Sequence, residues 1–341
     1  MTELRQDKVT GRWVIMSMGH AGQKATFSAL SDRIRIEELP AKVGNCPFCS
    51  GNENMTPPET VVWREGEEED ADWKIRVVPG RYPVLTPDGN DPLAEQDGSG
   101  VRPAYGLHEI IIETPQHNLH PGRFTPEQME TVIEACHHRF VALSQNSGIR
   151  SIILFRNYKE EAGASLEHPH TQVVALPFIY PALKEELEGA HRYFLAEGGC
   201  VFCSILREEL EAGERIVDVN DDFVALSPYA AGMPYETWIL PRKHSPSFQD
   251  IRRDQAASLA AMLGEIMTRI FVSLDDPPYL YYLHSAPLTA VTPPYYHWHL
   301  EIVPRMMKVA GFEWGTGVFI NTVPPEESAR FLAQTKVETY A

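Results

Sequence analysis

Apolar residues recur along this chain with the spacing of helices and of strands, and the helical pattern occurs twice. Between Thr125 and Asn146 they stand three or four positions apart, which places them on one face of a helix. Thr125 is a suitable N-cap for this helix, and Pro126 is a suitable first residue. The same offsets recur from Leu259 to Ile270. The pattern therefore predicts one long helix in each half of the chain.

Strand-like segments, short and rich in β-branched and aromatic residues, precede and follow both helices. They cover residues 13–18, 74–78, 108–113, 150–155, 172–176, 223–226, 236–240, 279–283 and 298–303. A charged, helix-like stretch at 181–199 separates the two sets of strands. This order predicts an α+β fold of two tandem units, residues 1–185 and 186–341. Each unit is expected to be a mostly antiparallel sheet with one long helix, and the two to merge into one continuous structure.

The composition excludes several classes of protein. The 341 residues are 43% hydrophobic, which suffices for packed cores. The start of the chain does not resemble a signal sequence, and its apolar runs are shorter than the ~20 residues that span a bilayer, so we expect a cytoplasmic protein without a membrane partner. The net charge of −17 argues against nucleic acid as a partner, because phosphate backbones are bound by clustered Lys and Arg. A small phosphorylated ligand is compatible with this charge.

Four of the five cysteines form two Cys-x-x-Cys pairs, and each pair is followed by a single His and then by a His-x-His. The first set is Cys46, Cys49, His117, His168 and His170, and the second is Cys200, Cys203, His244, His297 and His299. In a cytosolic protein such pairs favour metal or redox chemistry over structural disulfides. The parallel order of the two sets predicts a duplicated metal-binding unit.

Two thiolates and two imidazoles complete the tetrahedral shell that is typical of zinc. The predicted ligands are Cys46, Cys49, His117 and His168 at the first site and Cys200, Cys203, His244 and His297 at the second. His299 is the alternative to His297. Because a closed shell of four ligands leaves no position for water, we expect both zinc ions to be structural. The other interpretation is that the cysteines are reduced core residues and the histidines are unrelated.

The first His-x-His is the predicted reaction centre. If His168 binds the metal, His170 lies two positions along on the same strand face and is free to react. Imidazole is a good nucleophile toward phosphorus, and the product is itself activated for a second transfer. Gln172, a further strand period on, offers a neutral amide to a phosphoryl oxygen. In the second half Glu301 stands at this position, and because a carboxylate would repel an anionic substrate, we expect that half to be catalytically silent.

The turn before this centre contains small residues that suit a phosphate. Gly163 and Ser165 can bring backbone N–H groups and a hydroxyl close to phosphoryl oxygens. Asn157 can supply another neutral donor. The alternative is that His170 is a buried structural histidine whose hydrogen bonds are satisfied.

With these residues the chain resembles the galactose-1-phosphate uridylyltransferase family, a transferase branch of the histidine triad superfamily. The resemblance covers nearly the whole chain, and its segments are 10–15, the Cys pair at 46–49, 76–83, 108–113, the His-Pro-His-Thr-Gln core at 168–172 and 311–317. It implies two related halves and a ping-pong reaction. His170 is expected to attack the α-phosphorus of UDP-glucose and release glucose 1-phosphate. Galactose 1-phosphate is then expected to take the uridylyl group and leave as UDP-galactose.

The resemblance also implies roles for single residues. By resemblance, His170 is the nucleophile and Gln172 is the group that stabilises the intermediate. Asn157 and Ser165 correspond to contacts with the phosphates and the nucleotide. Glu313 corresponds to a contact with hexose hydroxyls, and Lys308 is a less secure match nearby. Glu313 is expected to be supplied across a homodimer. The implied partners are therefore a UDP-hexose, a hexose 1-phosphate and a second copy of the chain.

The chain also departs from the family pattern. Lys24 stands in a segment where the family often has arginines that face the phosphates, and lysine cannot make the bidentate contact of arginine. The complete second Cys-and-His set departs from members that hold iron there, so iron is the alternative metal at that site. In this second set the chain is similar to a side branch of the family that acts on ADP-sugars. An adenylyl transfer from ADP-glucose, with inorganic phosphate as acceptor, is therefore the main alternative reaction.

Two other functions fit part of this pattern. A nucleotide hydrolase of this superfamily normally has a third histidine where this chain has Gln172, and an amide cannot deliver a proton to the reacting centre. A zinc-stabilised nucleotide-binding protein without catalysis is the second.

Overall fold

The computed structural model describes residues 2–17, 39–66, 72–87, 101 and 103–336, so Lys24 lies outside the described residues. A ten-stranded sheet forms the centre of the molecule. Its strands, in spatial order, are β3 (Val61–Arg64), β4 (Trp73–Pro79), β5 (Leu107–Ile112), β7 (His170–Leu176), β6 (Ser151–Tyr158), β11 (Tyr279–His284), β12 (His299–Pro304), β10 (Thr237–Pro241), β9 (Phe223–Leu226) and β8 (Ile216–Val219). The pairings within this sheet are antiparallel.

The strand order reads alike from both ends, which confirms the duplication and the merging of the halves into one structure. At the centre β6 pairs with β11, and Phe155 lies opposite Tyr282. On its other side Phe155 is paired with Gln172 of β7, and Tyr282 is paired with Glu301 of β12. Gln172 and Glu301 are therefore equivalent positions of a pseudo-twofold arrangement.

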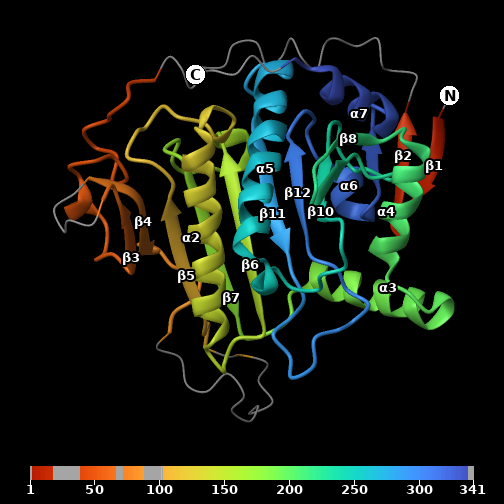
Figure 1. Cartoon of the computed structure of the whole chain (residues 1–341), viewed down its shortest axis with the longest axis horizontal. Coiled ribbons are helices and arrows are strands. Elements are labelled where there is room, and N and C mark those ends of the chain that lie inside the picture. Colours follow the sequence, from red (N-terminus) through yellow and green to blue (C-terminus); the bar gives the residue numbers. More distant parts are fainter. Residues whose placement is uncertain (1, 18–38, 67–71, 88–100, 102, 337–341) are drawn as a thin grey trace.

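The two predicted long helices are α2 (Pro126–Ser144) and α5 (Arg253–Ser273), which lie side by side across one face of the sheet (Figure 1). The side chain of Thr125 caps α2 by accepting a hydrogen bond from the Gln128 N–H group. Buried apolar residues of both helices join the alternate residues of the strands in one large core. By length and composition α5 is apolar enough to cross a membrane, but half of it is buried against this core, as expected of a core helix.

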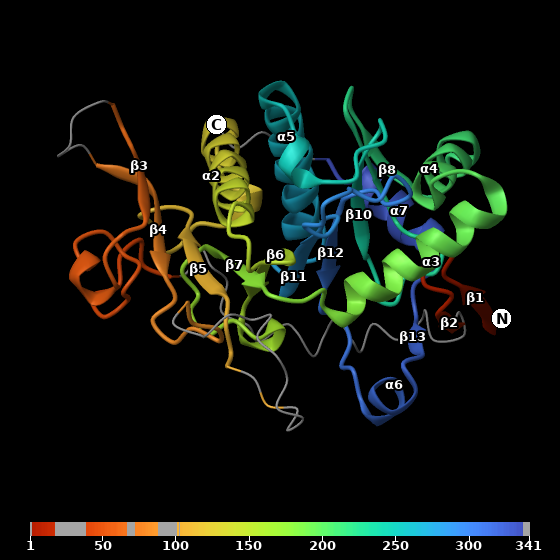
Figure 2. The same ribbon diagram turned by 90° about the horizontal axis from the view of Figure 1, so that it is seen from below.

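The opposite face of the sheet is covered differently in the two halves (Figure 2). In the C-terminal half α3 (Pro181–Glu197) and α4 (Val201–Ala212) pack on the strand residues that alternate with the main core, such as Trp238 and Leu240. In the N-terminal half the loop with Cys46 and Cys49 packs on β4 and β5. The sheet is thus buried on both faces.

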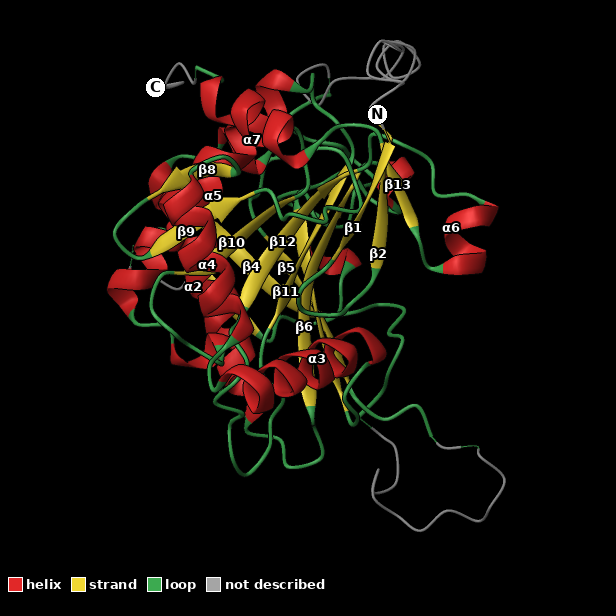
Figure 3. Cartoon of the chain, turned by 90° about the vertical axis from the view of Figure 1, so that its right-hand side faces the viewer, coloured by secondary structure: helices red, strands yellow, loops and turns green. Residues whose placement is uncertain are grey.

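The strand predictions agree with nine observed strands to within a few residues. Sequence periodicity missed the short elements β1 (Thr2–Gln6), η3 (Glu53–Met55), β3, η4 (Pro121–Arg123), η5 (Glu160–Ala162), α4, β8, η6 (Phe248–Asp250), α6 (Gly311–Thr316), β13 (Phe319–Asn321) and α7 (Pro325–Gln334). Strands β1, β2 (Trp13–Ser17) and β13 form a separate small sheet, in which the start of the chain pairs with its C-terminal part (Figure 3). Helix α3 runs across the predicted boundary at residue 185, so the division into 1–185 and 186–341 stays a prediction.

Candidate functional site

The first predicted metal cluster is assembled in the structure. Cys46, Cys49, His117 and His168 each offer one ligand atom, and these atoms lie within 4.8 Å of one another. His168 Nδ1 lies 3.7 Å from Cys46 Sγ and 3.6 Å from Cys49 Sγ. A tetrahedral shell with bonds of about 2.0 to 2.3 Å has edges of roughly 3.3 to 3.8 Å, so these separations fit a shared ion.

Protonation in this cluster also fits a metal. The second ring nitrogen of His168, Nε2, donates a hydrogen bond to the Thr114 carbonyl at 2.7 Å, which leaves Nδ1 unprotonated toward the thiols. Burial lowers the pKa of His168 to about 3 and raises the pKa of Cys46 to about 11. A buried thiolate at Cys46 therefore requires a bound cation, and the residues present fit one.

The second cluster joins Cys200, Cys203, His244 and His297, again within 4.8 Å of one another. Cys203 Sγ lies 3.4 Å from His244 Nδ1 and 3.6 Å from His297 Nδ1. His297, and not His299, is thus the histidine that approaches this cysteine pair. Cys200 is the N-cap residue of α4, so this cluster ties a helix to β12, whereas the first cluster ties an irregular loop to β7.

His170, the predicted nucleophile, is the first residue of β7 and is 7% exposed. Its Nδ1–H group donates a hydrogen bond to the His168 carbonyl at 2.7 Å. This contact assigns the proton to Nδ1 and leaves a lone pair on Nε2. Burial lowers the pKa of His170, although the hydrogen bond to His168 opposes the shift. His170 therefore presents a neutral imidazole with a free Nε2, the form that can attack phosphorus.

Gln172 is held by His108, a residue that sequence analysis missed as part of the site. The side-chain oxygen of Gln172 lies 3.0 Å from His108 Nε2, and His108 Nδ1 accepts a hydrogen bond from the Val84 N–H group at 3.4 Å. These contacts make His108 Nε2 the donor. They occupy the oxygen of the amide and leave its NH2 group to donate to a ligand. The sequence does contain a signal for His108. Side chains alternate between the two faces of β5, and this alternation sets His108 on the same face as Gln172.

Asn157 and Ser165 lie near the start of β7. Continuing the pairing of Phe155 with Gln172 by two residues sets Asn157 opposite His170. The Asn157 side chain donates to the Gly163 carbonyl at 3.4 Å, and Ser165 is exposed in the same turn. Asn157 also lines a cavity of about 740 Å³ that extends into the C-terminal half as far as His299.

The C-terminal half carries a different set of residues at the equivalent positions. His284, His299 and Glu301 form, together with Glu186 of α3, a buried cluster within 4.8 Å. His299 Nδ1 lies 3.1 Å from the His297 carbonyl, while its Nε2 lies 3.2 Å from Glu301 Oε1. Burial alone would lower the pKa of His299, but the hydrogen bond to Glu301 helps to raise it to about 9. Both ring nitrogens of His299 therefore face oxygen acceptors, an arrangement that favours the doubly protonated ring.

Glu186 and His284 were also missed by sequence analysis. Glu186 Oε1 lies 2.7 Å from His284 Nδ1, and Glu186 also accepts from the Tyr296 hydroxyl at 2.6 Å. A glutamate in a charged helix gives no sign of burial in the sequence. His284 ends β11 opposite His299, at the position equivalent to Asn157.

The two residues expected to reach the hexose lie in the C-terminal part of the chain. Glu313 is in α6, which projects beside β13 (Figures 2 and 3), and its side chain accepts a hydrogen bond from the Ala310 N–H group at 2.9 Å. Lys308 is exposed in the preceding loop. In the single chain Glu313 caps its own helix, so its expected contact with a hexose stays a prediction that involves a second subunit.

Comparisons with known proteins agree with this geometry. The model of the galactose-1-phosphate uridyl transferase N-terminal domain matches residues 1–179, and that of the C-terminal domain matches residues 152–314. The chain is 34% identical to an ADP-glucose phosphorylase from Arabidopsis thaliana, over 98% of this chain and 93% of the relative. It is 29% identical to a galactose-1-phosphate uridylyltransferase from Thermotoga maritima, over 99% of this chain and 100% of the relative.

Solved structures of the same two kinds of enzyme also match this chain. A crystal structure of an Arabidopsis thaliana ADP-glucose phosphorylase with bound ADP-glucose matches with a TM-score of 0.82 and 33% identity, over 99% of this chain and 100% of that one. A uridylyltransferase structure matches with a TM-score of 0.75 and 28% identity, over 98% of both chains.

Proposed function

We propose that this chain, which belongs to the galactose-1-phosphate uridyl transferase family, transfers a nucleotidyl group between sugar phosphates through a covalent bond to His170. As a member of this family it is a nucleotidyltransferase. The observation that carries the role of His170 is its hydrogen bond from Nδ1 to the His168 carbonyl, because it leaves Nε2 as a nucleophile. The neutral amide of Gln172 supports this role because it adds no negative charge beside a phosphate.

The proposed reaction has two steps. The lone pair of His170 Nε2 attacks the α-phosphorus of UDP-glucose, the bond between the α-phosphorus and the bridging oxygen breaks, and glucose 1-phosphate leaves with that electron pair. A phosphate oxygen of galactose 1-phosphate then attacks the same phosphorus, the P–N bond breaks, and UDP-galactose is released. The NH2 group of Gln172, oriented by His108, donates to a non-bridging oxygen in both steps. Asn157 and Ser165 contact the nucleotide and the phosphates.

Both Cys-and-His clusters are proposed to bind zinc in a structural role, with iron as the alternative at the second cluster. A closed shell of four protein ligands holds its ion without offering a position to substrate. In the first cluster the ion would hold His168, and the carbonyl of His168 sets the tautomer of His170. Four cysteines kept as metal ligands suit the reducing cytoplasm, the proposed location.

A second candidate donor is ADP-glucose, with inorganic phosphate as the acceptor. The observation that favours it is the 34% identity to an ADP-glucose phosphorylase over nearly all of both chains. The complete second Cys-and-His cluster points in the same direction. In this reaction His170 would carry an adenylyl group, and the roles of Gln172 and His108 would not change.

Isotope exchange tests the proposal and separates the donors. A ping-pong enzyme incorporates labelled glucose 1-phosphate into its donor without any acceptor, because the nucleotidyl enzyme forms reversibly. Exchange into UDP-glucose supports uridylyl transfer, and exchange into ADP-glucose supports adenylyl transfer. Steady release of glucose 1-phosphate into water without exchange would favour a hydrolase, and the absence of exchange into either donor would contradict the proposal.

The homodimer, with Glu313 acting across it, is the remaining part of the proposal. A His170→Asn subunit lacks the nucleophile, and a Glu313→Ala subunit lacks the hexose contact. If Glu313 acts across the dimer, a mixed dimer has one site that lacks both groups and one that is complete. Mixing the two inactive variants should therefore restore turnover, whereas Glu313 acting within its own chain predicts no gain.

A further inference from the structure

A buried ion pair joins the two halves next to the reaction centre. Lys159 follows β6 in the N-terminal half, and Asp276 follows α5 in the C-terminal half. Lys159 Nζ donates hydrogen bonds to Asp276 Oδ2 at 2.8 Å and to the Asp276 carbonyl at 2.7 Å. The hydroxyl of Tyr158 donates to Asp276 Oδ1 at 2.8 Å. The Asp276 side chain is 3% exposed and that of Lys159 is 12% exposed.

Both members of the pair have backbone conformations that non-glycine residues rarely adopt. Lys159 has φ +66° and Asp276 has φ +52°. Such conformations persist only where the surroundings hold them, and they gather at functional sites. The N–H group of Asp276 donates to the Phe271 carbonyl at 2.8 Å and so closes the end of α5. The ammonium group of Lys159 therefore lies at a helix C-terminus, where the helix dipole favours a positive charge.

Lys159 organises the turn between β6 and β7. Its carbonyl accepts hydrogen bonds from the N–H groups of Ala162 at 3.1 Å and Ala164 at 3.0 Å. Within this turn the Gly163 carbonyl accepts the hydrogen bond from Asn157. The turn leads directly to Ser165 and on to His168 and His170. Fixing Lys159 thus fixes the segment that the proposed function sets around the transferred phosphoryl group.

The ion pair occurs at only one of the two positions that the duplication relates. The arrangement that exchanges Phe155 with Tyr282 also exchanges Lys159 with Ala286 and Asp276 with Ile149. Ala286 and Ile149 are buried and apolar. The half with the reactive His170 is therefore held by a charged contact from its neighbour, and the opposite turn has no such charged pair at the equivalent position.

We propose that Asp276 is a positioning residue for the reaction at His170. From the catalytically silent half it holds Lys159 and Tyr158, and through them it sets the turn 159–165 and the end of β6 against the transferred phosphoryl group. This inference rests on the proposed function. It gives the C-terminal half a part in catalysis without requiring that any of its own histidines react.

Four variants and one control test the inference. Asp276→Ala and Lys159→Ala each release the turn, and because small displacements of a reacting group cost up to about 100-fold, kcat should fall about 10- to 100-fold with a much smaller change in KM. The double variant should lose little more than either single variant, because both act through one contact. Asp276→Asn keeps an acceptor for Tyr158 and should recover part of kcat. Amide hydrogen exchange at 160–165 should accelerate in Asp276→Ala.

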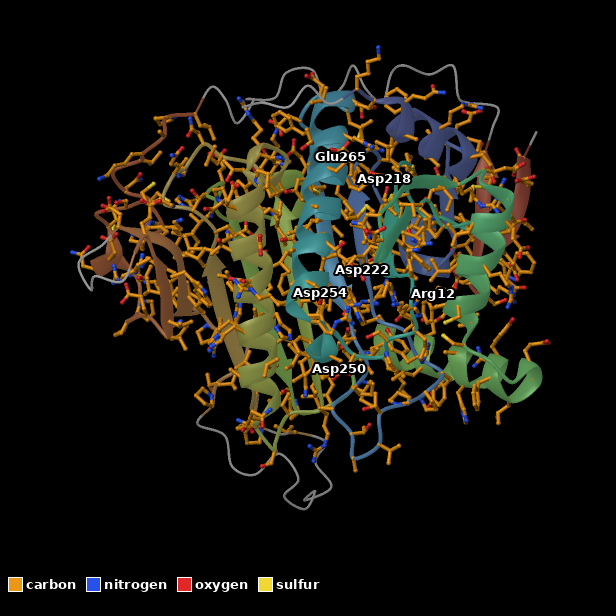
Figure 4. The ribbon with its side chains drawn as sticks, in the orientation of Figure 1. Arg12, Asp218, Asp222, Asp250, Asp254 and Glu265 are labelled. Carbon is orange, nitrogen blue, oxygen red and sulfur yellow. The ribbon has the colours of Figure 1, made fainter. Side chains whose placement is uncertain are left out.

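The control removes another ion pair of α5. Arg269 binds Asp218 at 3.2 Å and Glu265 at 2.9 Å; both acidic residues are labelled in Figure 4. Asp218→Ala should leave kcat and exchange at 160–165 unchanged. Unaltered kcat in Asp276→Ala, additive losses in the double variant, or equal losses in the control would overturn the inference. Absence of turnover by the unaltered enzyme would refute the proposed function, and the inference would fall with it.

Discussion

The two halves of this protein share one backbone arrangement and differ in residue type at three of four equivalent positions. The N-terminal half has His170, Gln172, His108 and Asn157, and the C-terminal half has His299, Glu301, Glu236 and His284. In the first set no member is a carboxylate. In the second, His299 hydrogen-bonds Glu301, and His284 hydrogen-bonds Glu186 of α3. The same fold therefore places an imidazole beside a neutral amide in one half and beside a carboxylate in the other.

The two halves differ in what contacts the second ring nitrogen, Nε2, of the equivalent histidines His170 and His299. His170 and His299 both approach the carbonyl two residues earlier through Nδ1. Nε2 of His299 contacts Glu301, and the pKa of His299 rises to about 9. Gln172 instead gives its oxygen to His108 and leaves Nε2 of His170 without this contact. The residue two positions after each histidine, Gln172 or Glu301, thus decides whether a carboxylate lies against Nε2.

The two halves also differ at the position of His108, where the C-terminal half has Glu236. It occupies the place of His108, and burial together with the neighbouring Glu301 raises its pKa to about 8. Its carboxylate accepts hydrogen bonds from the N–H groups of Gly232 and Met233. Glu236 thus contacts backbone N–H groups, whereas His108 contacts the side chain of Gln172. The C-terminal half therefore differs at the position of His108 as well as at the position of Gln172.

Removing the nucleophile should have the largest effect. His170→Asn should lower the exchange of glucose 1-phosphate on the order of 10⁴-fold or more, because no other group forms the covalent intermediate. The matched change His299→Asn should leave exchange per folded molecule nearly unaltered. Isotope exchange and circular dichroism measure both variants. Comparable losses in the two variants would remove the contrast between the halves.

The second-largest effect is expected when the residue of the C-terminal half is placed at the equivalent position of the N-terminal half. In Gln172→Glu a carboxylate would bind Nε2 of His170 and repel the phosphate, so single-turnover formation of the nucleotidyl enzyme should slow about 100- to 1,000-fold. Rapid-quench kinetics would measure this rate. Gln172→Asn serves as a control that shortens the side chain without adding charge and should be less impaired. A Gln172→Glu enzyme as fast as the unaltered one would show that charge at this position is irrelevant.

The two metal clusters should also differ in their effect on catalysis. Cys46→Ser should lower exchange about 10-fold, since His168 ties the first cluster to His170 and disturbed supporting contacts of this kind cost about 10- to 100-fold. Cys200→Ser should mainly lower the melting temperature, because its cluster anchors α4. Zinc and iron content by mass spectrometry, melting curves and exchange rates measure this. Equal catalytic losses would mean that both clusters support the reaction centre alike.

The smallest effect is expected at His108. His108→Phe removes the hydrogen bond that orients Gln172, and a contact worth about 1 kcal/mol corresponds to roughly a fivefold loss of kcat. Steady-state kinetics would measure it, and the double variant with Gln172→Ala should add little. A loss equal to that of His170→Asn would instead give His108 a direct part in the chemistry.

Local patterns predicted much of this molecule, and contacts between distant segments account for the rest. Nine of the strands, the two long helices and both Cys-and-His sets follow from periodicity and spacing within the sequence, whereas the short strands β1, β3, β8 and β13 do not. The clustering of Glu186 with His284 depends on α3 folding over the sheet, and a charged helix does not reveal which of its faces is buried. The contact between Lys159 and Asp276 joins residues from different halves. Neither contact has a local signature.

The most direct test of the contrast between the halves is to locate the covalent intermediate. The enzyme is mixed with UDP-glucose or ADP-glucose, and the reaction is quenched within one turnover. The protein is then digested at neutral to alkaline pH, and the peptide that carries the nucleotidyl group is identified by mass spectrometry. We expect a nucleotidyl group on the peptide that contains His170 and none on the peptide that contains His299. A nucleotidyl group on His299, or one that persists in His170→Asn, would contradict this expectation.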